Sequence, residues 1–479
     1  MVESPRQIAQ EDVAAILERH LAWLESDGEK GERANLQGAY LWKVNLREAT
    51  LRKADLREAS LVEADLTGAD LREACLDEAS LVDARLQGAD LQGVRLSRAY
   101  LNGADLQDAR LQGADLRQAT LSGSTLQRAD LNGGDLQGAN LQNADLSGAR
   151  LLHANLRRAN LLRATLQGAA LSGADLADTN LLRTHLSGAD LTGADLTGAQ
   201  LKEADLTGAI LTGADLARAN LNGANLSGAL LQGTDLTGAR LEGACLAEAD
   251  LYDADLTGAH LARADFQRAN LHDATLRAAD LERAVLDEAD LSKADLSEAT
   301  FEDASLLDAD LTGACLQRAR LQRAALTRAD LTGADLTGAD LTGAHLDKAT
   351  LEQARLEDAR LHRANLTRAH LRQATLARAD LSNAKLHRAG LQGADLKGTD
   401  FMQAALTRAD LEGAGLQGAQ FRGAYLREVN YRGATLDEAD LRGAKLLAVE
   451  ALFEAASRRR VKVDLRAKLA VWLYEVRRK

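Results

Sequence analysis

Large apolar residues recur at every fifth position from Leu36 to Leu446, and no insertion or deletion breaks this register. A small residue, usually Ala, lies two positions before each of them, and the residue between the two is often Asp or Asn. A helix advances about 100° per residue, so a five-residue period would spread the leucines over all of its faces. The pattern therefore excludes an amphipathic helix for this part of the chain.

A spacing of two residues places the small and the large apolar side chains on one face of an extended segment. The other residues of each repeat must turn the chain. In Leu-Thr-Gly-Ala at 331–334, Gly333 takes the third position of a four-residue turn, which needs a positive φ in a type II turn. Of the 39 glycines, 34 occupy this position; where Arg, Glu or Asp occupies it, we expect a different turn type. The pattern predicts a solenoid with an interior of Ala and Leu and with coils about 4.8 Å apart.

The phrase Ala-Asp-Leu-Thr-Gly at 334–338 resembles the motif of the pentapeptide-repeat family, and the resemblance covers residues 34–446. It implies an all-β solenoid, a right-handed quadrilateral β-helix with four repeats per coil and about 21 coils, with short helical segments at both ends. Residues twenty apart then stack on adjacent coils. The expected domains are an N-terminal helical cap at 1–33, the β-helix at 34–446 and a basic amphipathic helical segment at 447–479.

The N-terminal segment is expected to cover the first coil. Ser4 suits the N-cap of a helix, Pro5 its first position and Gly28 its end. One apolar stripe of this helix would contain Ala9, Val13, Ile16, Leu17 and Leu24. An outward apolar ladder of residues twenty apart is expected to seat the helix, or else a partner: Trp42, Val62 and Val82.

The C-terminal segment, 447–479, carries nine Lys and Arg against four acidic residues. Asp464 suits an N-cap, and five apolar residues after it keep helical spacing: Leu465, Leu469, Trp472, Leu473 and Val476. Three interpretations stay open: a cap on the last coil, a homodimer or partner contact, and binding to a membrane surface. Family members that act on DNA gyrase dimerise through their C-terminal ends, so the resemblance strengthens the second interpretation, but the cap remains the favoured one. A membrane is the least favoured, because the helix is short.

The sequence shows no sign of catalysis. No cluster of His, Cys and carboxylates has the spacing of a metal site, and no two of the nine histidines lie twenty apart. Cys75, Cys245 and Cys315 are too scattered to pair, as expected in a reducing compartment. We therefore expect a protein that is not an enzyme and needs no cofactor or metal.

One run of acidic residues is expected to form a ladder: Asp175, Asp195, Asp215, Asp235 and Asp255. Like charges at strand spacing repel one another. Asp before Leu is the consensus of the motif, and its carboxylate can bond to turn backbone. The functional interpretation is a row of negative charge that imitates the phosphates of DNA, as the resemblance to quinolone-resistance members suggests.

The charge balance reverses between Arg355 and Gly390, where eight Lys and Arg accompany three acidic residues. A mimic of DNA should be acidic along its whole contact surface. Direct binding of nucleic acid is not favoured either, because the chain has a net charge of −13 and this stretch lacks outward aromatic residues for base stacking.

Two pairs of outward apolar residues interrupt the polar surface. Leu162 should stack on Leu182, and Ile210 on Leu230. The motif normally has polar residues at these positions, so the pairs indicate a contact patch for a protein.

These observations favour a bacterial, non-enzymatic scaffold that mediates protein–protein interaction. One alternative is a DNA-mimicking binder of DNA gyrase or topoisomerase that gives protection from inhibitors. Another is an accessory domain for an enzyme on a separate chain. The N-terminal segment is charged and amphipathic and no apolar run approaches 18 residues, so we expect a cytoplasmic protein without a signal peptide.

Overall fold

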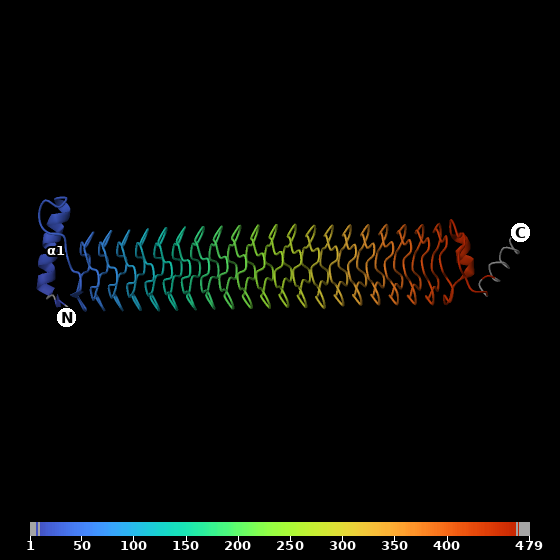
Figure 1. Ribbon diagram of the computed structural model, residues 1–479, viewed down its shortest axis with the longest axis horizontal. Helices are drawn as coiled ribbons and strands as arrows, with labels where there is room; N and C mark the ends of the chain where they lie inside the picture. The colour runs from blue at the N-terminus through green and yellow to red at the C-terminus, as the bar shows by residue number, and fades with distance from the viewer. Residues whose placement is uncertain (1–5, 8–9, 466–467, 469–479) are drawn as a thin grey trace. The chain divides into compact units, whose positions relative to one another are not determined.

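The computed structural model describes residues 6–7, 10–465 and 468. The chain has two parts, Met1–Arg240 and Leu241–Lys479. Figure 1 shows helix α1 (Gln10–Glu25) at the blue end of the chain and the short 3-10 helix η1 (Val449–Glu454) at the red end. Two short strands, β1 (Arg6–Gln7) and β2 (Ala39–Tyr40), pair in parallel, with Arg6 opposite Ala39.

Both parts are built from the same coil. Parallel bridges join residues twenty apart, from Asn35 with Asp55 to Asn220 with Arg240 in the first part, and from Cys245 with Asp265 onward in the second. Each bridge comes with backbone hydrogen bonds in both directions. The Leu36 N–H, for example, donates to the Asp55 carbonyl (2.7 Å), and the Asp55 N–H donates to the Ala34 carbonyl (3.0 Å). The stacking of residues twenty apart is therefore confirmed within each part.

The interior consists of the predicted Ala and Leu side chains, nearly all of which are at most 2% exposed. Phe401 and Phe421 stack inside adjacent coils with ring centroids 4.9 Å apart. Hydroxyl residues that replace Ala donate their proton to a backbone carbonyl, as Thr234 does to Leu211 (2.9 Å). A buried hydroxyl without such a partner would be costly, so these substitutions leave the interior satisfied.

The turns differ from the prediction at positions that lack glycine. Every residue at the third turn position, from Gly38 to Gly443, has a φ between 53° and 71°, whether it is Gly, Arg, Glu or Asp. The expectation of a second turn type is therefore wrong. The N–H of this residue donates to a carbonyl on the next coil, as Lys43 does to Val62 (3.0 Å), and another turn would break that bond. A residue other than Gly there costs about 1 kcal/mol in backbone strain.

The N-terminal end differs from the prediction at the start of the helix. Helix α1 begins at Gln10 and not near Pro5, because Arg6 and Gln7 form strand β1; Ser4, Pro5 and Ala9 lie outside the described residues. The helix ends before Gly28, as predicted: Gly28 has a φ of 92° and donates its N–H to the Trp23 carbonyl (2.8 Å). Val13 is buried, whereas Ile16, Leu17 and Leu24 are half-buried.

The residues of the expected apolar ladder differ in their exposure. Trp42 is 48% exposed, and Val62 and Val82 are half-buried. The Lys43 ammonium lies 4.4 Å from the Trp42 ring centroid. Trp42 is therefore only partly covered, and the seating of the helix or a partner on this ladder stays a prediction.

The C-terminal segment departs from the expected helix over its first half. Ser457 pairs with Thr435 and Lys462 with Asp440, so residues twenty-two apart are joined here. The two additional residues belong to the stretch that contains η1, and the chain then continues the stack. Asp464 accepts the Gly443 N–H through its side chain (3.0 Å). Leu465 is 83% exposed, and Leu469, Trp472, Leu473 and Val476 lie outside the described residues.

Candidate functional site

We call outward side chains that lie twenty apart on stacked coils a row. Rows are held in place by the motif itself. The Asp or Asn before each Leu accepts the backbone N–H two residues later, as Asp195 does from Thr197 (2.9 Å). This bond fixes the carboxylate against the turn and still leaves the side chain partly exposed.

The predicted acidic ladder is present over four of its five residues. Bridges join Asp175 to Asp195, Asp195 to Asp215, and Asp215 to Asp235. Asp255 belongs to the second part of the chain, where it accepts the Thr257 N–H (2.8 Å). All five carboxylates accept such a backbone N–H, so the structural role weighed from the sequence is confirmed.

The charges of this ladder are unevenly compensated. Asp175 lies 3.9 Å from a terminal nitrogen of Arg157. Among the residues that the structure describes, Asp195, Asp215 and Asp235 form no ion pair. The stretch Asp195–Asp235 therefore presents three stacked carboxylates without a counter-charge in contact, at a strand spacing of about 4.8 Å.

Both predicted apolar pairs are stacked. Ile210 and Leu230 pair directly, and Leu230 is 39% exposed. Leu162 and Leu182 occupy the same turn position on adjacent coils, because the Arg163 N–H donates to the Leu182 carbonyl (3.0 Å), and both side chains are half-buried.

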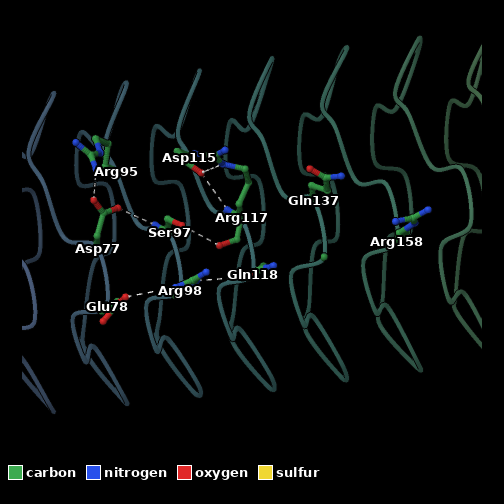
Figure 2. A pocket seen from close by; sticks show the side chains of 11 residues that line it. Asp77, Glu78, Arg95, Ser97, Arg98, Asp115, Arg117, Gln118, Gln137 and Arg158 are labelled. Carbon is green, nitrogen blue, oxygen red and sulfur yellow. Dashed lines mark hydrogen bonds and ion pairs between the residues drawn. The ribbon is translucent and has the colours of Figure 1, made fainter.

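The first part of the chain has an open groove of about 540 Å³ that was not predicted from the sequence. Figure 2 shows its charged side chains crossing from coil to coil. Arg117 binds Asp115 through two hydrogen bonds (2.8 and 2.6 Å), which hold the pKa of that carboxyl below its usual range. Arg98 lies between Gln118 (3.1 Å) and Glu78 (3.7 Å). Because its acidic and basic side chains neutralise one another, this groove does not point to a charged ligand.

A substitution in the motif explains part of that groove. The position before Leu96 is Arg95, which has no acceptor for the Ser97 N–H. Asp77, on the preceding coil, accepts that N–H instead (3.2 Å) and also binds Arg95. In the same way, Asn132 accepts the Leu152 N–H (2.9 Å), and Asp287 accepts the Leu307 N–H (3.0 Å). The sequence signal for this arrangement is an Asp or Asn twenty positions before each N–H that lacks an acceptor within its own turn.

One cluster has the composition of a catalytic triad. His272 Nδ1 lies 2.6 Å from Ser292 Oγ, and its Nε2 lies 3.2 Å from Asp273. However, the Ser292 hydroxyl donates its only proton to Asp290 (2.5 Å). His272 therefore donates to Ser292 and cannot act as its general base. The spacing of the histidines does not reveal this cluster, because His272 lies against Tyr252 and Ser292 and not against a second histidine.

Two buried titratable groups also escaped the sequence analysis. His20 of α1 is fully buried: its Nε2 lies 3.0 Å from the Arg52 carbonyl, and its Nδ1 accepts the Ala34 N–H (3.1 Å). Burial lowers the pKa of His20. Asp440 is 1% exposed and binds Arg442 (2.6 Å) and Arg422 (2.8 Å), and the hydrogen bonds from Arg442 lead the causes that lower its pKa.

Metal sites and membrane-spanning helices are the other kinds of feature considered for the described residues. The described residues contain no group of three or more His, Cys, Asp and Glu side chains that could hold a metal ion. Within the same residues, no helix has both the length and the apolar character required to cross a membrane.

A family model described as pentapeptide repeats, eight copies, matches successive stretches from residues 32–68 to 404–443, which together cover 32–443. No curated protein matches the chain.

Solved structures with the same kind of repeat also match. HetL, a pentapeptide repeat protein involved in heterocyst differentiation regulation from the cyanobacterium Nostoc sp. strain PCC 7120, is 38% identical over 45% of this chain and 86% of HetL, with a TM-score of 0.20. Rfr23 from the cyanobacterium Cyanothece 51142 is 28% identical over 24% of this chain and 63% of Rfr23, with a TM-score of 0.18. QnrB1, a plasmid-mediated fluoroquinolone resistance protein, is 18% identical over 53% of this chain and 95% of QnrB1, with a TM-score of 0.15.

Proposed function

The chain belongs to the pentapeptide-repeat family, and on this premise we propose that it is a non-enzymatic scaffold that binds another protein through its outward rows. One observation carries the proposal. The Ala and Leu interior repeats almost unchanged from coil to coil, whereas the outward side chains differ. The interior therefore supplies stability, and only the surface can distinguish one stretch of the chain from another.

The division into a cap at 1–33, a β-helix at 34–446 and a C-terminal segment at 447–479 remains part of this proposal, as do a cytoplasmic location and a bacterial origin. Contact with a second copy through Leu465 and the apolar residues that follow is a further part. It is supported by the exposure of Leu465.

The alternative is binding to DNA gyrase or topoisomerase in place of DNA. The row Asp195–Asp235, which has no ion pair among the described residues, favours it. The second part of the chain is evidence against this alternative, because its surface is not continuously acidic. Arg355 binds Asp335 (3.2 Å) and Arg378 binds Asp358 (2.6 Å) within rows of mixed charge.

Affinity capture from a bacterial lysate, read by mass spectrometry at low and high salt, tests both functions. The intact chain is compared with one that ends after Asp464, which keeps the bond to Gly443. We expect the intact chain to capture a specific protein. Gyrase or topoisomerase subunits that are lost at high salt would support mimicry. A partner lost with the tail would place the contact after Asp464, and no specific protein in any sample would contradict the scaffold.

A further inference from the structure

The stretch from Ser187 to Gln232 has a face unlike the charged surfaces described above. Its central row runs from Asp190 through Ile210 to Leu230, joined by parallel bridges. Ile210 is half-buried, and Leu230 is 39% exposed. Asp, Asn or Thr fills this motif position on many other coils, so two stacked aliphatic residues are a local departure from the pattern.

Glycines border this row on both sides. The turns before it contain Gly188, Gly208 and Gly228, and the turns after it contain Gly193, Gly213 and Gly233. A Cβ at any of these six positions would meet nothing within 4 Å. The turn residue before each glycine is Ser, Thr or Gln. No long charged side chain stands on either border, so a partner can approach the aliphatic row closely. We call this surface the glycine-rimmed face.

Carboxylates lie beyond both borders. Asp205 lies on one side, and Asp195, Asp215 and Asp235 form the row on the other. Within the described residues, none of them has an ion pair. Two neighbouring cations, Arg183 and Lys202, are already bound to Glu203 (2.7 and 3.8 Å), and Arg218 stands on the turn after Asp215. The glycine-rimmed face is thus apolar along its centre and negative on both flanks.

We propose that the glycine-rimmed face binds a basic amphipathic α-helix of a partner protein, laid along the rows. The apolar stripe of such a helix would cover Ile210 and Leu230. Lys and Arg on its two flanks would extend their aliphatic stems over the glycine borders to the carboxylates. This inference rests on the proposed scaffold function and specifies the class of its partner.

The spacing of the rows suits a helix. Coils are about 4.8 Å apart, and a helix rises about 1.5 Å per residue, so helix residues three apart are separated by about 4.5 Å. An apolar pair at i and i+3 therefore matches Ile210 and Leu230. Asp195 and Asp235 are two coils, or about 9.6 Å, apart, close to the roughly 10.5 Å between helix residues i and i+7. One face of a helix stays in register with three coils.

The test uses the full chain and a fluorescent peptide of about 15 residues, made of one Leu stripe flanked by Lys, with binding measured by anisotropy. The variant D195N/D215N/D235N should lower the affinity about tenfold, because three favourable charges are lost. The variant I210N/L230N should lower it about fivefold through lost apolar contact. Asn can keep the backbone bond that Asp makes at this motif position, as Asn160 does when it accepts the Leu162 N–H (3.3 Å). These variants should therefore fold.

A matched control lies in the second part of the chain. Asp290, Asp310 and Asp330 are also stacked and also accept turn N–H groups. Their turns, however, contain Glu288, Asp308 and Arg328, and neither neighbouring row holds a stacked pair like Ile210 and Leu230. D290N/D310N/D330N changes the net charge equally and should alter the affinity by less than about twofold. An equal loss with this control would mean nonspecific attraction and would overturn the inference.

Two further outcomes would also overturn it. They are unchanged affinity in I210N/L230N, and failure of the Leu–Lys peptide to bind better than the same peptide with Glu in place of Lys. The proposed scaffold function fails separately. If the intact chain captures a partner from the lysate and I210N/L230N captures it equally well, the scaffold stands and the glycine-rimmed face is not its site.

Discussion

Helix α1 closes the first coil around a neutral histidine, whereas the last regular coils are closed around an ionised carboxylate. His20 is held between two backbone groups, the Ala34 N–H and the Arg52 carbonyl. Asp440 is held between two arginines. The coils between the ends have an almost entirely apolar interior, and carboxyls with a lowered pKa, such as that of Asp115, make their stability depend on pH only in acid. Each end of the chain should therefore be stable over its own range of pH.

Removing His20 should have the largest effect. H20A leaves the Ala34 N–H and the Arg52 carbonyl buried without partners, at a cost of about 3 kcal/mol in local stability. The loss should stay near the first coil, because a solenoid is stabilised mainly by neighbouring coils. Faster tryptic cleavage after Lys30 and Arg33 measures it. H387A, at an exposed turn, is the control and should leave the rate unchanged; equal rates for both variants would contradict this role of His20.

Neutralising Asp440 should destabilise the other end by about 2 kcal/mol. D440N removes the charge that binds Arg422 and Arg442, and both arginines are about half exposed, so the cost is less than for a fully buried pair. Hydrogen exchange of the Leu441 and Lys462 amides should accelerate. D400N, in the same row and without an ion pair among the described residues, should change exchange by less than about 0.5 kcal/mol. Unchanged slow exchange of these amides in D440N would contradict the prediction, because it would mean that Arg422 and Arg442 find other hydrogen-bond acceptors.

Acid should destabilise the two ends of the chain at different pH values. The pKa of His20 is lowered in the folded protein. The contribution of His20 to the free energy of unfolding is therefore complete above the ordinary pKa near 6.5 and declines as the pH falls below that value. The slope is at most about 1.4 kcal/mol per pH unit. The pKa of Asp440 is also lowered, so its contribution is lost only below the ordinary value near 3.9. Proteolysis at pH 5 with an acid-tolerant enzyme should therefore open the N-terminal end first, and simultaneous opening of both ends would contradict the comparison.

The smallest expected effect is a stabilisation, in contrast to the destabilising variants above. Tyr431 replaces an interior Leu, and its buried hydroxyl has no hydrogen-bond partner among the described residues. Y431F should stabilise the C-terminal coils by about 0.5–1 kcal/mol, because Phe occupies equivalent interior positions and needs no partner. The midpoint of urea unfolding measures the change. Destabilisation would indicate that the hydroxyl is bonded.

The sequence was sufficient for the interior and the rows, because the direction of a side chain follows from a strict period. It predicted the stacking of Ile210 on Leu230, and the glycines beside them were visible at 188, 193, 208, 213, 228 and 233. It failed at the turns that hold Arg or Glu, since their positive φ is imposed by a hydrogen bond to the next coil. It failed for His20 too, because its partners lie fourteen and thirty-two residues away and no local pattern indicates them.

We propose that the outward surface, and specifically the glycine-rimmed face, carries the binding function. Photo-crosslinking of the full chain would locate the bound peptide, with a diazirine in place of one Leu of the Leu–Lys peptide and mapping by mass spectrometry. We expect crosslinks concentrated between Ser187 and Asp235 and lost in I210N/L230N. Crosslinks spread evenly over the acidic rows, or concentrated between Asp290 and Asp330, would contradict it.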